Sequence, residues 1–171
     1  PDTAASDYLT YRAVLDSQLS VAEGTAAQVI MIPGNHDWRN GNRDGYDAVV
    51  RQQFYVSFLN KPNVRYLPEE GCPGPEAVPI GDDIMLIIFD SQWWLHLYDK
   101  PEIESDCTCK TTDELVTQIR DIAVKNSKKL IIVASHHPFE SNGPHGGYFQ
   151  LKQHIFPFTD LRPNLYIPLP L

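Results

Sequence analysis

The sequence contains no apolar run near the roughly 20 residues that a membrane-spanning helix needs. It also lacks an excess of positive charge, since 14 Lys and Arg residues stand against 22 Asp and Glu residues, giving a formal net charge of −8. A chain without a dense basic stripe is a poor match for a nucleic-acid backbone. We therefore expect no membrane segment here and no nucleic-acid partner. An acidic chain can still bind phosphorylated substrates when metal ions supply positive charge locally.

Cysteine is scarce, with only Cys72, Cys107 and Cys109. The pair Cys107 and Cys109 lacks the Cys-x-x-Cys spacing of structural zinc sites, and no second pair completes four ligands. A disulfide between Cys72 and one member of the pair is favoured over a zinc knuckle. Such a bond would suit an oxidising compartment.

The apolar residues that are present predict an α/β fold. Runs near residues 29–32, 84–89 and 130–134 are short and rich in Ile and Val, which is typical of strands buried on both faces. Amphipathic helices are predicted before the first strand (residues 5–22), after it (from Asp44), and before the third strand, where Thr111 and Glu114 form a capping-box pattern. With 171 residues and no evident linker, residues 1–171 are expected to form a single domain.

Each of the three predicted strands runs into a cluster of polar residues. The clusters are Asn35-His36-Asp37, Asp90-Ser91-Gln92 and Ser135-His136-His137. If the strands are neighbours in one sheet, these clusters meet at one edge, where ligands usually bind in α/β proteins. Amide oxygen, imidazole and carboxylate together suit Zn, Mn or Fe. The alternative for the first cluster is an ordinary strand-to-helix turn in which Asn35 or Asp37 caps the helix.

Gly34-Asn35-His36-Asp37 resembles the Gly-Asn-His-Asp/Glu motif of calcineurin-like metallophosphoesterases. His136-His137-Pro138 resembles the later His-x-Pro block of the purple acid phosphatases in that superfamily. His145, followed by Gly146, stands where small purple acid phosphatases carry a second substrate-facing histidine. The resemblance implies part of an α/β/β/α sandwich and phosphate-ester hydrolysis with two divalent ions (Fe, Mn or Zn). Together with the cysteines, it favours a periplasmic or otherwise exported location.

The resemblance also implies roles for individual residues. Asn35 and His136 would bind the same metal ion, whereas His36 would face the phosphate and protonate the leaving oxygen. Asp37 would hold the His36 ring, and His145 would assist at the phosphate. Separately, Arg39 and Arg43 follow the Asn-His turn, so they could either clamp a phosphate or remain solvated loop charges.

Three blocks of the family pattern do not occur in these 171 residues. They are an Asp-x-His and a Gly-Asp-x-x-Asp before the Asn-His block, and a Gly-His-x-His after the His-x-Pro block. We expect an incomplete domain of a longer enzyme, with a weakly occupied or empty metal site and little activity in the 171 residues alone. A phosphodiesterase or nucleotidase of the same superfamily, or a non-catalytic binding domain that has lost its metal site, are the alternatives.

Overall fold

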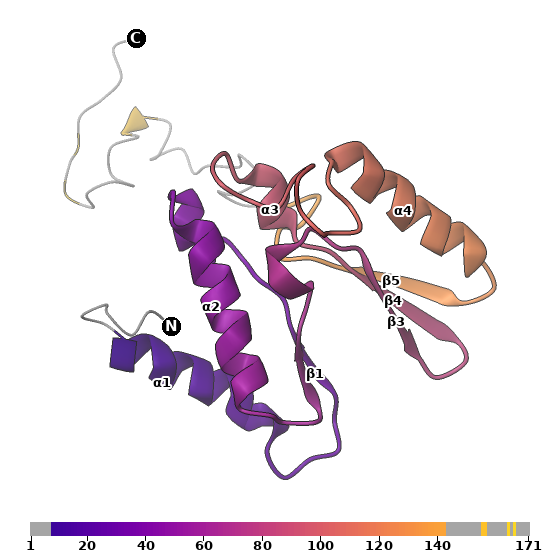
Figure 1. Ribbon diagram of the computed structural model, residues 1–171, viewed down its shortest axis with the longest axis horizontal. Helices are drawn as coiled ribbons and strands as arrows, with labels where there is room; N and C mark the ends of the chain where they lie inside the picture. The colour runs from indigo at the N-terminus through magenta and orange to yellow at the C-terminus, as the bar shows by residue number, and fades with distance from the viewer. Residues whose placement is uncertain (1–7, 143–154, 157–163, 165, 167–171) are drawn as a thin grey trace. The chain divides into compact units, whose positions relative to one another are not determined.

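The computed structural model describes residues 8–142, 155–156, 164 and 166. The chain divides into two compact units, Pro1–His137 and Pro138–Leu171, and the elements named here belong to the first. They are α1 (Tyr8–Leu19), η1 (Ser20–Ala22), β1 (Val29–Met31), η2 (Arg39–Gly41), α2 (Gly45–Phe58), β2 (Val64–Tyr66), η3 (Glu69–Gly71), β3 (Glu76–Ile80), β4 (Ile84–Ile88), α3 (Ser91–Leu95), α4 (Thr112–Lys125) and β5 (Leu130–Ala134). The predicted α/β class is confirmed (Figure 1). Within the described part, no helix is both long and apolar enough to cross a bilayer.

The first sheet consists of β1 and β2, which run parallel with Val29 opposite Val64 and Met31 opposite Tyr66. Helices α1 and α2 lie beside these strands (Figure 1). The apolar cluster at their junction combines side chains from both helices, from β2, from the turn after β1 and from α3. Its buried members are Leu15, Leu19, Trp38, Val49, Val56, Tyr66 and Trp93.

The second sheet has the order β3-β4-β5. Strands β3 and β4 form an antiparallel hairpin around the turn at residues 81–83, and β4 and β5 are parallel. Helix α4 forms the crossover from β4 to β5 and begins at Thr111, where the predicted capping box is present. Strand β3 was not predicted, because Pro75 and Pro79 made its segment resemble a turn-rich loop.

The burial predicted for two of the strands was wrong. β1 is half-buried, and most of β5 is exposed, with Leu130 at 62 %. Only β4 is largely buried, as predicted. Apolar composition gives a strand the capacity to be buried, but another element must cover it. The two apolar clusters of the described residues lie around α1 and α2 and around Phe89 and Leu115, and neither includes a residue of β5.

Two further features shape the surroundings of the site. The Asp90 side chain caps the short helix α3, which follows β4 directly. On α2, Phe54 and Phe58 are exposed. The expected disulfide forms between Cys72 and Cys107, while Cys109 is a buried free thiol.

Candidate functional site

The turns that follow β1 and β5 meet, although their strands belong to different sheets. Asn35 follows β1 and His136 follows β5, and His136 Nε2 lies 3.0 Å from Asn35 Oδ1. The polar clusters were expected to meet if their strands were neighbours in one sheet. In the structure, the turns after β1 and β5 meet although the two strands are in different sheets.

Gly34 lets the two turns approach this closely. A Cβ atom at residue 34 would lie 2.5 Å from Nδ1 and 2.6 Å from Cε1 of His136, which is shorter than real contacts of this kind allow. The His136 imidazole therefore packs directly against the Gly34 backbone. Any other residue at this position would force the ring, and with it Nε2, away from its present place.

The turn after β1 is held by bonds between its own residues. The backbone N–H groups of Trp38, Arg39 and Asn40 donate to the carbonyls of Gly34, His36 and Asn35 at 3.1, 3.0 and 2.7 Å. Asp37 was expected to orient the His36 ring, but in the structure its Oδ2 accepts a 2.8 Å bond from the Gly34 N–H. His36 itself is exposed.

Asp90 supports this turn from the interior. Its Oδ2 accepts a 2.7 Å bond from Trp38 Nε1, and its Oδ1 accepts bonds from the N–H groups of Gln92 and Trp93 at 2.8 and 3.1 Å. Burial raises the pKa of the Asp90 carboxyl from 3.8 to about 7; the three N–H donors act in the opposite direction, and the charge of Asp37 adds to the increase. Sequence reasoning placed Asp90 at the edge of the site but missed its bond to Trp38.

Ser91 connects the middle cluster to the turn after β5. Its Oγ lies 2.9 Å from His137 Nδ1 and accepts a 3.0 Å bond from the His137 backbone N–H. Burial, followed by the neighbouring His136, lowers the pKa of His137. All three predicted clusters are thus joined, with Asp90 holding the first and Ser91 the third.

The remaining aromatic residues near the site belong mostly to the core. Trp38 is fully buried, and His96 packs against it with ring centroids 4.7 Å apart. Both ring nitrogens of His96 are buried and have no hydrogen-bond partner among the described residues. Burial lowers the pKa of His96, an effect that Lys100 increases. Trp38 therefore packs in the core beneath the turn that carries Asn35 and does not form a wall of the site.

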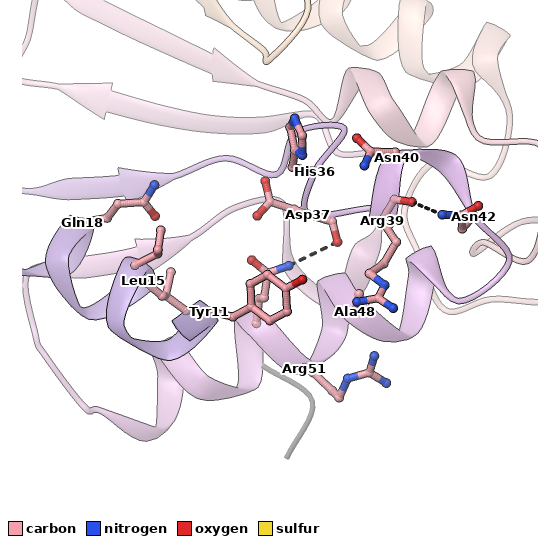
Figure 2. A pocket seen from close by; sticks show the side chains of 12 residues that line it. Tyr11, Leu15, Gln18, His36, Asp37, Arg39, Asn40, Asn42, Ala48 and Arg51 are labelled. Carbon is pink, nitrogen blue, oxygen red and sulfur yellow. Dashed lines mark hydrogen bonds between the residues drawn. The ribbon is translucent and has the colours of Figure 1, made fainter. Parts of the chain in front are cut away.

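The other predicted site residues do not lie together. His36, Asp37 and Arg39 line a cavity of about 540 Å³ between α1, α2 and the turn after β1 (Figure 2). Arg39 also pairs with Asp44 at 3.2 Å. Arg43 lies elsewhere, with its guanidinium carbon 4.7 Å from the centroid of the Tyr98 ring. His145 lies outside the described residues.

Asn35 Oδ1 and His136 Nε2 are two atoms of the kinds that can bind zinc. Around a tetrahedral zinc ion with ligands at about 2.0–2.2 Å, two such atoms lie about 3.4 Å apart. The 3.0 Å between them is a hydrogen-bond distance that is slightly shorter than this separation. The part of the chain that the structure describes contains no group of three His, Cys, Asp or Glu residues able to hold an ion. The described residues therefore supply a ligand pair rather than a complete metal site.

Comparison with known proteins identifies one family. A family model described as calcineurin-like phosphoesterase matches residues 7–167, which is nearly the whole chain. No curated protein and no solved structure matches the chain. The family match includes both turns of the site.

Proposed function

The chain belongs to the calcineurin-like phosphoesterase family, and from this premise we propose that it carries part of the active site of a phosphatase that uses two divalent metal ions. The observation that supports this most directly is the 3.0 Å approach of Asn35 and His136 from two different sheets. Metal ions of this kind, when bound, polarise the phosphoryl oxygens and lower the pKa of water so that hydroxide is available near neutral pH.

The residues of this chain have separate tasks in the proposal. Asn35 and His136 hold one ion between them, and Gly34 keeps the His136 ring in place. His36, exposed at the mouth of the cavity, donates a proton to the leaving oxygen of the substrate. His145, by its resemblance to purple acid phosphatases, assists at the phosphate. Phosphate monoesters are the proposed substrates.

The metal assignment is tested by substituting its two ligands. In a protein that also carries the remaining metal ligands of the family pattern, Asn35→Ala and His136→Ala should each lower the bound metal by about one ion per chain after dialysis against manganese or zinc, because each removes a ligand of the same ion. Elemental analysis measures the stoichiometry, and circular dichroism verifies that the fold is retained. If both variants bind as much metal as the wild type, the assignment is wrong.

His36→Ala serves as the matched variant, because His36 is proposed to act on the substrate and to leave the metal alone. It should keep its metal but lose about 100- to 10,000-fold in turnover, the usual contribution of a general acid. The loss should be smaller for substrates with good leaving groups. A variant that loses its metal would contradict this role, and the absence of both metal binding and turnover before any substitution would instead support the non-catalytic binding domain that has lost its metal site.

Two expectations from the sequence remain proposals. We propose that the 171 residues alone hydrolyse phosphate esters poorly, because they supply only two of the ligands that the family pattern requires. A colorimetric phosphatase assay with added manganese or zinc tests this. We also propose an exported or periplasmic location, which the Cys72–Cys107 disulfide supports because such bonds persist in oxidising compartments.

A further inference from the structure

The cavity beside His36 has two walls of different chemistry, both predictable from helical spacing. On α1, Tyr11, Val14 and Leu15 share one face at i, i+3 and i+4, and on α2, Ala48 and Arg51 do the same at i and i+3. These faces confront each other across the cavity, and His36 and Asp37 lie at one end (Figure 2). The cavity therefore opens directly beside the proposed reaction site.

The α1 wall offers apolar surface to a ligand. Tyr11 is 49 % and Val14 is 55 % exposed, although both line a cavity. Apolar side chains that remain exposed in a concave site gain stability when a ligand covers them. An aromatic or aliphatic group would fit against this wall.

The α2 wall offers positive charge. Arg51 Nε is buried, and no hydrogen-bond acceptor in the described part of the chain reaches it. A buried donor without a partner is unfavourable, so an anion that accepted its hydrogen bond would be stabilised there. Arg39 adds a second guanidinium, although Asp44 pairs with it at 3.2 Å. The Asp37 carboxylate also lines the cavity, but it accepts a bond from the Gly34 N–H.

The position of Arg51 separates it from the proposed reaction site. Figure 2 shows Arg51 at the end of the cavity away from His36 and Asp37. An anionic group bound at Arg51 is therefore not the phosphoryl group presented to His36, and it lies away from the negative charge of Asp37. The cavity volume of about 540 Å³ is large enough for a small organic molecule that spans both ends.

We propose that this cavity is a substrate subsite for phosphate esters whose organic part carries a ring and a second anionic group. The ring packs on Tyr11 and Val14, and the second anion binds Arg51, while the phosphoryl end faces His36. This inference rests on the proposed phosphatase function for the identity of the ligand as a substrate. Arg51 is then the residue that determines substrate specificity.

Binding is tested first, in the presence of EDTA, so that the result does not depend on metal. Isothermal titration calorimetry compares phenylacetate, which has a ring and a carboxylate but no phosphoryl group, with acetate, which lacks the ring, and benzyl alcohol, which lacks the anion. We expect phenylacetate to bind at least about tenfold more tightly than either, because it contacts both walls. The absence of binding by phenylacetate, or equal affinity for all three, would overturn the subsite.

Substitutions of two arginines on helices test whether Arg51 is the residue that binds the anionic group. Arg51→Gln should weaken phenylacetate binding about tenfold, the cost of one charge-assisted hydrogen bond. Arg51→Lys, which keeps the charge and loses the planar fork, should have an intermediate affinity. Arg120→Gln is the matched control, since Arg120 is an exposed arginine on α4 that pairs with Asp121, and it should bind as the wild type does. If Arg51→Gln and Arg51→Lys both bind like the wild type, the assignment of Arg51 is wrong.

Turnover then distinguishes this inference from the function on which it rests. In a protein that also carries the remaining metal ligands of the family pattern, and with manganese added, kcat/KM should be higher for 4-carboxyphenyl phosphate than for phenyl phosphate, and Arg51→Gln should bring the ratio close to one. A ratio close to one without the substitution would contradict the second anionic contact. Failure of that protein to hydrolyse either ester would contradict the phosphatase function, while the EDTA experiment would still decide whether the cavity binds aromatic anions.

Discussion

The turn after β1 and the turn after β5 present Asn35 and His136 to each other, but they are held in different ways. The first turn contains three backbone hydrogen bonds, and its Trp38 is fully buried against the carboxylate of Asp90. The second follows the exposed strand β5, and its described links to the rest of the site are Ser91 and the contacts of the His136 ring with Gly34 and Asn35. The first turn is held by three internal backbone bonds and by Asp90, whereas the second has one internal bond, from Ser135 Oγ to the carbonyl of His137 at 3.1 Å, and otherwise depends on its neighbours.

This difference has a consequence for the site. The position of His136 relative to Asn35 is set mostly by the residues that His136 and His137 touch, since β5 provides little buried surface to hold them. Asp90 and Ser91 are adjacent in the sequence and serve one turn each. Substituting them one at a time therefore tests how the two turns differ.

Removing Asp90 should have the largest effect, because it leaves the buried Trp38 Nε1 without an acceptor and takes the cap from α3. Asp90→Ala should lower the free energy of unfolding by about 3 kcal/mol at neutral pH. Urea denaturation measures the change. Asp82→Ala is the control, since Asp82 is an exposed residue in the turn between β3 and β4, and it should change stability little. Equal effects of the two substitutions would show that Asp90 does not support the first turn.

The pH dependence of stability should show an effect of similar size with a definite sign. The pKa of Asp90 is about 7 in the folded chain and close to 3.8 when unfolded, so between these values the folded state holds a proton that the unfolded state has lost. Ionisation of Asp90 therefore lowers the free energy of unfolding as the pH rises from about 4 to about 7, while the hydrogen bonds that Asp90 accepts from Trp38 and from α3 persist above that range.

This second prediction is checked by urea titrations at several pH values, comparing the wild type with Asp90→Asn. The free energy of unfolding of the wild type should fall relative to that of the variant as the pH rises through this range. A difference that stays constant, or that grows with pH, would mean that the Asp90 carboxyl does not titrate as its burial implies.

Gly34→Ala should have an intermediate effect, because the new Cβ would overlap the His136 ring. We expect a loss of about 2 kcal/mol, typical of an overpacked site, together with changed NMR resonances of the His136 imidazole. The same substitution in a His136→Ala background should cost close to nothing, since the ring is then absent. If Gly34→Ala lowers the free energy of unfolding equally in both backgrounds, the loss does not come from the contact between Gly34 and His136.

Ser91→Ala should have the smallest effect, about 1 kcal/mol, because it removes the two hydrogen bonds to His137 and creates no large cavity. Amide hydrogen exchange should become faster at residues 135–137 and remain unchanged at residues 35–40. Ser105→Ala is the matched control, since it removes an exposed bond to the carbonyl of Glu102. Faster exchange in both turns would show that they are coupled more tightly than their contacts indicate.

The sequence predicted the parts of this molecule that depend on local patterns. The strands near 84–89 and 130–134 and the capping box at Thr111 followed from apolar runs and turn residues. The pairing of Asn35 and His136 could be anticipated, because polar groups at strand ends gather at one edge of an α/β unit.

The parts that the sequence did not predict depend on contacts between distant residues. The bond from Trp38 to Asp90 spans 52 positions, and no local pattern distinguishes it from ordinary core packing. The exposure of β5 could not be predicted either, because an apolar strand gives no sign of whether another element covers it. Arg51 looked like an ordinary helical surface residue until α1 was placed opposite it.

The contact between Gly34 and His136 also limits how this protein can evolve. Every residue other than glycine adds a Cβ at position 34, so no single substitution there leaves the imidazole undisturbed. A lineage that first lost the histidine would become free to accept other side chains at position 34. Restoring the histidine would then require glycine to return beforehand. Among relatives of this chain, the two positions should therefore change together and in a fixed order, although they lie far apart in the sequence.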